Sequence, residues 1–172
     1  MITFFKTEDP KMINENLIIH RFLENYCEHF MNNISSKKVK NDSVKFFVTL
    51  FEILPKDITI DTMSNLLFKL KPKIKIKALT CIYELVKAGK IVELQFMQKF
   101  YDAFEKTSVS RTLAIKKLTM DILKEAYYYM GDELIKRVVV FKESVKKELD
   151  KWVKTVDEKD MKIVEIDEKY RV

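Results

Sequence analysis

Apolar residues recur every three or four positions along most of the chain, which is the pattern of a helix with one buried face. Polar stretches, prolines and glycines divide this pattern into eight segments. Their apolar positions are, in order, Ile19, Phe22, Leu23, Tyr26 and Phe30; Val44, Phe47, Val48, Phe51 and Leu54; Met63, Leu66, Leu67 and Leu70; Ala78, Leu79, Ile82, Leu85 and Val86; Leu94, Met97, Tyr101 and Phe104; Ile115, Leu118, Ile122, Ala126 and Tyr129; a short segment after Gly131; and Val145, Leu149, Trp152, Val153 and Val156. Because the sequence lacks the alternation and turn pairs of hairpins, it predicts an all-α fold.

Residue types at the breaks indicate where several helices begin and end. Pro10 predicts the start of the first helix, because proline fits the first helical turn. Pro55 predicts the end of the second helix. Gly89 and Gly131 predict the ends of the fourth and sixth helices, and Asp132 is expected to cap the helix that follows.

A short signature recurs near the start of every second helix: an apolar residue, a basic residue, two further residues, an apolar residue, three more, and an apolar residue. It is complete at Ile74, Lys75, Ala78 and Ile82. A second full copy occurs at Val145, Lys146, Leu149 and Val153. Weaker copies occur at Val44, Lys45 and Val48, and at Ser110, Arg111, Ala114 and Leu118. An interval of about 35 residues is typical of stacked helix pairs. We expect the apolar positions to face neighbouring helices and the basic residue to lie in the first turn of its helix.

This spacing and signature resemble those of HEAT repeats. We therefore predict a HEAT-like α-solenoid of about four antiparallel helix pairs over residues 1–156, followed by a charged tail over residues 157–172. In such an array the turns inside the pairs line up along one edge. The turns expected here are residues 35–43, 70–73, 106–109 and 141–144.

The expected edge is basic. Its turns and the adjacent first helical turns supply the candidate binding residues Lys37, Lys38, Lys40, Lys45, Lys71, Lys73, Lys75, Lys106, Arg111, Lys142 and Lys146. A cation in the first turn of a helix opposes the helix dipole, so its repetition favours a functional role. The alternative is that lysine is simply common in a chain with 32 basic residues.

Three stretches resemble the TOG domain, the tubulin-binding HEAT array of microtubule polymerases. They are residues 71–90, 104–111 and 144–154, and the likeness spans roughly residues 60–156. It implies that the turns bind a curved αβ-tubulin dimer. Lys73, Lys75, Lys106 and Arg111 would then face α-tubulin, and Lys37, Lys38 and Lys40 would lie nearer β-tubulin. The chain has fewer helix pairs than is usual in that family, and its single tryptophan, Trp152, is in the last helix rather than the first loop.

Charge and cysteine content limit the possible partners and the cellular compartment of the protein. The net charge of +6 is compatible with an acidic protein, a nucleic acid or an anionic membrane as partner. Cys27 and Cys81 do not make a disulfide framework and fit a reducing compartment. Neither a signal-peptide pattern nor an apolar run of roughly 20 residues occurs, so we expect a soluble intracellular protein without a membrane partner.

No catalytic arrangement is recognisable. Two glycines cannot supply a nucleotide-binding glycine loop. His20, Cys27 and His29 give three candidate zinc ligands where a structural site needs four. Residues 127–129 are three tyrosines that could stack on bases, but consecutive helical residues point in different directions and form no single platform. We therefore expect a protein that is not an enzyme and has no cofactor, metal or small-molecule substrate.

The leading hypothesis is a tubulin-binding TOG-like module that contributes to microtubule assembly or spindle organisation, at the cytoskeleton or spindle pole of the cytoplasm. The second is a HEAT-repeat scaffold for another acidic protein. The third and least favoured is nucleic-acid binding, because 26 acidic residues nearly balance the 32 basic ones.

Overall fold

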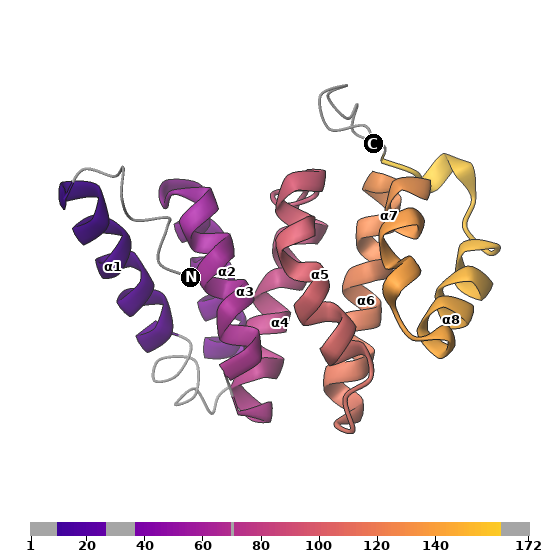
Figure 1. Cartoon of the computed structure of the whole chain (residues 1–172), viewed down its shortest axis with the longest axis horizontal. Helices are drawn as coiled ribbons and strands as arrows, with labels where there is room; N and C mark the ends of the chain where they lie inside the picture. The colour runs from indigo at the N-terminus through magenta and orange to yellow at the C-terminus, as the bar shows by residue number, and fades with distance from the viewer. Residues whose placement is uncertain (1–9, 27–36, 70, 163–172) are drawn as a thin grey trace.

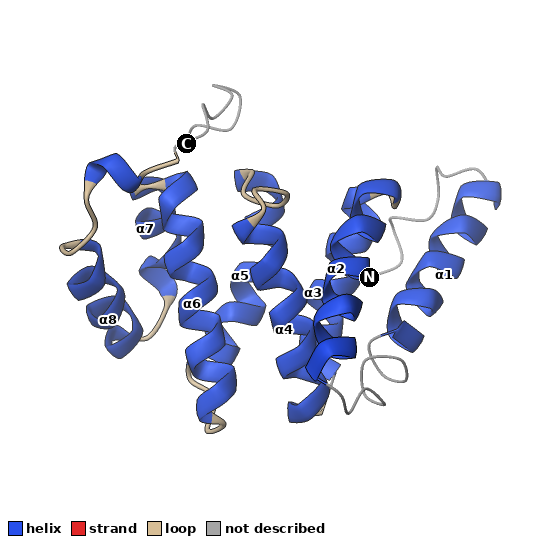
Figure 2. Cartoon of the chain, turned by 180° about the vertical axis from the view of Figure 1, so that it is seen from behind, coloured by secondary structure: helices blue, strands red, loops and turns tan. Residues whose placement is uncertain are grey.

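The computed structural model describes residues 10–26, 37–69 and 71–162, and over these ranges the chain is helical without strands. Figure 2 shows the helices joined by short loops. The elements are α1 (Pro10–Asn25), α2 (Lys37–Ile53), α3 (Lys56–Lys69), α4 (Pro72–Lys87), α5 (Leu94–Ser108), α6 (Leu113–Met130), α7 (Asp132–Arg137), the 3-10 helix η2 (Val138–Val140), α8 (Glu143–Val153) and the 3-10 helix η3 (Glu158–Asp160). The predicted all-α class is confirmed. None of the described helices has the length and apolar character needed to cross a bilayer.

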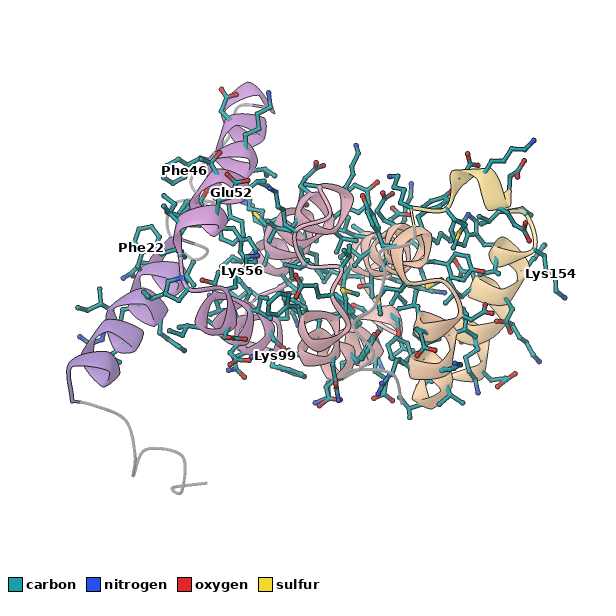
Figure 3. The ribbon with its side chains drawn as sticks, turned by 90° about the horizontal axis from the view of Figure 1, so that it is seen from above. Phe22, Phe46, Glu52, Lys56, Lys99 and Lys154 are labelled. Atoms are coloured by element: carbon teal, nitrogen blue, oxygen red, sulfur yellow. The ribbon has the colours of Figure 1, made fainter. Side chains whose placement is uncertain are left out.

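Successive helices run alternately down and up across the molecule (Figure 1). Along one row α1 contacts α3 and α3 contacts α5, while along the other α2 contacts α4, α4 contacts α6, and α6 contacts α8. Helices α3 and α4, and likewise α5 and α6, also contact each other across the rows. Seen from above, side chains fill the space between the two rows (Figure 3). The core is therefore one continuous layer along the length of the array.

Most of the predicted apolar positions lie in this core. Its largest fully buried side chains include Phe47, Phe51, Phe100 and Phe104, and the rings of the last two stack at 5.5 Å between centroids. Phe22 is the clear exception, because 43% of its surface remains exposed. Partial burial is found at Ile19, Val48, Leu54, Leu118, Tyr129, Trp152, Val153 and Val156. Phe30, Leu70 and the Leu94 side chain lie outside the described part of the chain.

The signature assigned to the sixth helix was wrong in register. Ala114 is exposed, and Arg111 precedes α6, which begins at Leu113. The buried line runs through Ile115, Thr119, Ile122 and Ala126, so the apolar stripe predicted for this helix was right at Ile115, Ile122 and Ala126. Thr119 is tolerated there because its hydroxyl donates to the Ile115 carbonyl at 2.9 Å and bonds the Thr107 hydroxyl at 2.9 Å. Because Thr119 is polar, the signature placed Ala114 and Leu118, rather than Ile115 and Thr119, on the buried side of α6.

The start of the second helix was also predicted too late. Residues 37–43 were expected in a loop but belong to α2, which places Lys45 in the third helical turn rather than the first. The segment 37–53 contains neither glycine nor proline, and lysine favours helix when it faces water. Its polarity was therefore mistaken for a break.

Glycines end two helices as predicted. At the end of α4 the Gly89 amide donates to the Val86 carbonyl at 2.8 Å and the Lys90 amide donates to the Leu85 carbonyl at 2.9 Å. With a φ of 68° at Gly89, this pair of bonds forms a Schellman motif. The ends at Pro10 and Pro55 also agree with the prediction.

The helix after α6 begins differently from the prediction. Gly131, with a φ of 55°, closes α6 and also occupies the N-cap of α7. Asp132 is the first residue of α7 and makes no side-chain capping bond. The negative charge of Asp132 still suits the first turn of a helix, through the helix dipole.

The first part of the charged tail folds back over α6. The Lys162 amide donates to the Tyr128 carbonyl at 2.6 Å, and its ammonium lies 3.4 Å from the Glu125 carboxylate and 5.0 Å from the centre of the Tyr129 ring. The end of the Met161 side chain lies beside Gly131. Residues 157–162 are thus part of the folded unit.

Candidate protein-binding edge

The connections within the helix pairs lie along one edge of the molecule. Those between α3 and α4, α5 and α6, and α7 and α8 all lie at the bottom of Figure 1. We call the side chains at these connections the turn edge, which comprises residues 68, 71–75, 105–113 and 138–146. Its candidate cations are Lys71, Lys73, Lys75, Lys106, Arg111, Lys142 and Lys146.

The local structure places each of these cations near a helix end. Lys71 and Lys142 are the N-cap residues of α4 and α8. Lys75 and Lys146 lie in the first turns of the same helices, as the signature predicted. The three remaining members are Lys73, in the first turn of α4, Lys106, in the last turn of α5, and Arg111, in the loop before α6.

The candidates on α2 are distributed differently. Lys37, Lys38 and Lys40 begin α2, and the surroundings of their side chains lie outside the described residues. Lys45 is exposed but lies about 12 Å along the helix axis from the start of α2. The structure therefore does not bring Lys45 to the turn edge.

Four cations of the turn edge are exposed and make neither an ion pair nor a cation–π contact. These are Lys71, Lys73, Arg111 and Lys142, considered against the described residues only. An exposed ammonium or guanidinium without a carboxylate partner remains available to an external anion.

The other cations of the turn edge are partly engaged. The Lys146 ammonium lies 2.9 Å from the Glu143 carboxylate. Lys106 places its ammonium 4.4 Å from the centre of the Phe68 ring, a cation–π contact that holds the charge over an exposed ring. Burial lowers the pKa of Lys75 below the ordinary lysine value. The edge thus combines free charges with charges held in place by their neighbours.

Exposed apolar side chains accompany these cations, and the sequence analysis missed them. They are Phe68 at 41% exposure, Val109 at 37%, Leu113 at 77%, Val139 at 62% and Val140 at 66%. At least one lies at each described connection of the turn edge. Single exposed apolar residues are ordinary, but a row of them beside cations is typical of a protein-binding surface. The exposure of Leu113 and Val139 could have been inferred from the sequence, because both residues lie outside the predicted apolar stripes and next to predicted loops.

The opposite edge has a different charge pattern. Lys90, after α4, lies 2.6 Å from the Glu52 carboxylate at the end of α2, and this bond lowers the pKa of Glu52. Lys136 in α7 pairs with Glu133. On the adjoining α3–α5 face, the Lys99 ammonium lies 3.0 Å from the Asp61 carboxylate. Glu52 and Lys99 are labelled in Figure 3, which looks down on this side. Lys90, Lys99 and Lys136 are thus paired with carboxylates, whereas Lys71, Lys73, Arg111 and Lys142 at the turn edge are not, within the described part of the chain.

A groove of about 670 Å³ runs between α2 and α4. Its floor and walls combine apolar, hydroxyl and oppositely charged groups from Val44, Lys45, Val48, Thr49, Thr80, Glu84 and Ala88. Thr80 already donates its hydroxyl to the Ile76 carbonyl at 2.8 Å.

Metal ligands are not clustered in the described part of the chain. No group of three or more His, Cys, Asp or Glu side chains there could hold an ion. The Cys81 side chain is fully buried. Of the candidate zinc ligands, Cys27 and His29 lie outside the described residues.

Comparison with protein-family models, curated proteins and solved structures gives no match for this chain.

Proposed function

We propose that this chain is a HEAT-like α-solenoid of antiparallel helix pairs that binds an acidic protein surface through the turn edge. The alternating direction of the helices and their contacts in two rows support the solenoid. The protein acts by binding, without catalysis. Its partner is αβ-tubulin, a choice that rests on the TOG resemblance of residues 71–90, 104–111 and 144–154.

One observation carries the proposal: exposed cations without ion pairs and exposed apolar side chains share the same edge of the described structure. Lys73 and Arg111 exemplify the cations, and Leu113 and Val140 the apolar residues. Positive charge steers an acidic surface toward the edge, and apolar contact stabilises the complex once water is excluded. Binding to a partner would therefore weaken with salt but not disappear.

The apolar residues also favour a protein over a nucleic acid as partner. A nucleic-acid backbone presents charged phosphates, which leave exposed Val139 and Val140 without a matching surface. A folded protein surface offers both carboxylates and apolar atoms. In the cell, such a module would help to deliver or hold tubulin during microtubule assembly or spindle organisation, at the cytoskeleton or spindle pole.

The test is binding of the chain to purified unpolymerised αβ-tubulin, followed by sedimentation velocity over a salt series. The variant Lys73→Glu with Arg111→Glu is expected to weaken binding by about 100-fold at low salt. Lys56→Glu with Lys87→Glu is the matched control, because it makes the same change in net charge away from the turn edge. Helix content measured by circular dichroism should be the same in all three proteins.

Each result separates the hypotheses. No binding of the unmodified chain to tubulin at low salt would refute tubulin as the partner, whereas equal losses in both variants would refute the turn edge as the site. A second variant, Leu113→Ser with Val140→Ser, should reduce affinity by about tenfold even at high salt, because it removes apolar contact rather than charge. Tight, steeply salt-dependent binding to DNA or RNA instead would favour the nucleic-acid alternative.

A further inference from the structure

A cavity of about 360 Å³ lies where the end of α8 and the folded-back segment meet the junction of α6 and α7. This junction is at the top of Figure 1, on the edge of the array opposite to the turn edge. The volume is at the lower end of the range for ligand pockets, roughly 300–1,000 Å³, so the cavity suits a single side chain or a small ligand. Its lining combines two carboxylates, a phenol and an apolar wall, from Asp132, Glu158, Tyr127, Val153, Val156 and Met161.

The two carboxylates of the cavity have no cationic partner among the described residues. Asp132 and Glu158 are exposed and take part in none of the ion pairs there. The lysines nearest in sequence, Lys154 and Lys159, neither line the cavity nor pair with its carboxylates. Lys162 is paired at 3.4 Å with a carboxylate of α6 instead. Because carboxylates are ionised at neutral pH, the cavity carries unbalanced negative charge.

Tyr127 adds a polar group that is more than nine-tenths buried. Its side chain is held by the Trp152 ring, which it meets edge-on at 5.8 Å between centroids. The Tyr127 hydroxyl makes no hydrogen bond within the described part of the chain. Burial, and then the charge of Asp132 in the same cavity, raises the pKa of Tyr127, so the hydroxyl stays protonated at neutral pH. A ligand that bonds to this hydroxyl would offset the cost of burying it without a partner.

Backbone hydrogen bonds fix the segment that carries Glu158. The Asp157 side chain accepts from the Lys159 amide at 3.1 Å and so caps η3. A few residues later, the Lys162 amide donates to the Tyr128 carbonyl at 2.6 Å, which ties the segment to α6. The other carboxylate belongs to the first residue of α7. A ligand would therefore meet charges that are already in place, which lowers the entropy lost on binding.

The lining matches the chemistry of an alkylammonium group. An ammonium ion has three N–H donors and no acceptor, and Asp132, Glu158 and the Tyr127 hydroxyl all offer acceptor oxygens. Val153 and Val156 provide an apolar wall of the kind along which a lysine side chain lays its methylene groups. An anion would be repelled by the two carboxylates. A free polyamine would place its further charges against the apolar wall, which is unfavourable.

We propose that this cavity binds the ammonium group of a lysine side chain presented by a polypeptide partner. The site is distinct from the turn edge, which is basic and lies on the opposite edge of the array. The two edges thus recognise opposite charges. The proposal does not depend on which protein binds the turn edge, and either one can fail without the other.

The test is titration of the full chain with the blocked tripeptide acetyl-Ala-Lys-Ala-amide, followed by amide NMR. The chain has two glycines, whose amide resonances fall in a sparsely populated region of the spectrum. Gly131 lines the cavity and Gly89 does not, so the Gly131 resonance should shift saturably while that of Gly89 stays in place. The same peptide with norleucine in place of lysine keeps the apolar stem without the charge. It should bind at least about tenfold more weakly.

Variants of the cavity locate the binding site. Asp132→Asn with Glu158→Gln should weaken binding of the lysine peptide at least about tenfold, because it removes both charges and keeps the side-chain shapes. The matched control, Asp102→Asn with Glu105→Gln, makes the same change at two carboxylates of α5 that do not line the cavity. Tyr127→Phe keeps the ring and should weaken binding about threefold.

Several results would overturn the proposal. They are a Gly131 resonance that does not shift at any peptide concentration, equal binding of the norleucine peptide, and equal losses in the cavity variant and its α5 control. Tighter binding of spermidine than of the lysine peptide would identify a free polyamine, rather than a polypeptide, as the ligand. The NMR spectrum of each variant reports its folding directly. If the double variant does not fold, Tyr127→Phe and the norleucine peptide still decide between the outcomes.

Discussion

The helices at the two ends of the array carry similar apolar stripes, but the apolar side chains of these two helices are buried to different extents. On α8, Val145 and Leu149 are buried, and the Trp152 ring meets the Tyr128 ring edge-on at 5.5 Å. On α1, Leu23 is equally buried, yet Phe22 beside it remains 43% exposed. A stripe therefore determines which side of a helix is apolar, and neighbouring elements determine how much of that side is buried.

The contacts between helices are likewise less extensive toward the N-terminal end. The contact between α4 and α6 is the most extensive in the structure, whereas α2 and α4 diverge enough to leave the groove between them. Local stability follows the density of buried contacts, so different parts of one fold open with different free energies. We expect the α1–α2 pair to open before the helices from α4 onward. The predictions below compare matched substitutions in the two regions.

The largest contrast is expected from two leucines that are both fully buried. Leu123→Ala should lower the free energy of unfolding by about 4 kcal/mol and Leu23→Ala by about 2 kcal/mol. Leu123 lies on α6, which contacts four other helices, so the cavity cannot collapse; Leu23 lies on α1, whose main contact is α3. Urea denaturation followed by circular dichroism measures both. Equal losses would show that the two regions are held equally firmly.

The next contrast concerns an aromatic residue at each end. Trp152→Ala should cost about 2 kcal/mol, less than for a fully buried tryptophan, because Trp152 is only half-buried. Phe22→Ala should change the stability by less than about 0.5 kcal/mol. Thermal or urea unfolding gives both values. A larger effect at Phe22 than at Trp152 would contradict the comparison.

Tyr101 is an exception within the better-packed region. Its hydroxyl is buried and has no hydrogen-bond partner among the described residues, whereas the nearby Thr107 and Thr119 hydroxyls are bonded. Tyr101→Phe should therefore leave stability unchanged or raise it by up to about 1 kcal/mol. Urea unfolding near neutral pH checks this, and a loss beyond about 1 kcal/mol would show that the hydroxyl is satisfied.

The burial of Tyr101 also predicts that the protein loses stability at alkaline pH. Burial raises its pKa above the ordinary value of 10.0, so the folded state holds the proton more tightly than the unfolded state does. The corresponding stability is fully present below the unfolded pKa and is lost progressively as the pH rises above it. Unfolding curves at about pH 8 and about pH 11 should differ more for the unmodified chain than for Tyr101→Phe. Identical shifts in the two proteins would assign the alkaline effect to other groups.

The smallest effect is expected at the folded-back segment. Lys162→Ala should cost about 0.5 kcal/mol, because the Lys162 side chain, which pairs with Glu125 and contacts the Tyr129 ring, is itself 52% exposed. The Lys162 amide bond to Tyr128 is retained in this variant. Differential scanning calorimetry is sensitive enough to detect the change. A loss of several kcal/mol would mean that the ammonium, rather than the backbone, holds the segment in place.

Much of the fold could be predicted from the sequence, because local signals agree with it. Pro55 and Gly89 mark helix ends for reasons that do not depend on tertiary contacts. The burial of Thr119 on α6 could not be predicted, since its hydroxyl bonds the Thr107 hydroxyl on another helix. The start of α2 was missed because a polar helix and a polar loop have the same composition.

The candidate site was predictable only in part. The positions of Lys73 and Lys142 followed from the turns. The exposure of Leu113 and Val140 did not, because exposure depends on which element fails to cover a residue. Long-range packing thus separates the apolar residues that stabilise the array from those left for a partner.

The folded-back segment also sets the mechanics of the molecule. Residues 157–162 run over α6, and the Tyr129 hydroxyl of α6 donates at 2.9 Å to the Lys87 carbonyl at the end of α4. A force applied at residue 162 would therefore reach α6 and α4 through these bonds as well as α8 through the peptide chain. A tether at this end would load the best-packed helices in shear, while the α1–α2 pair would remain without tension.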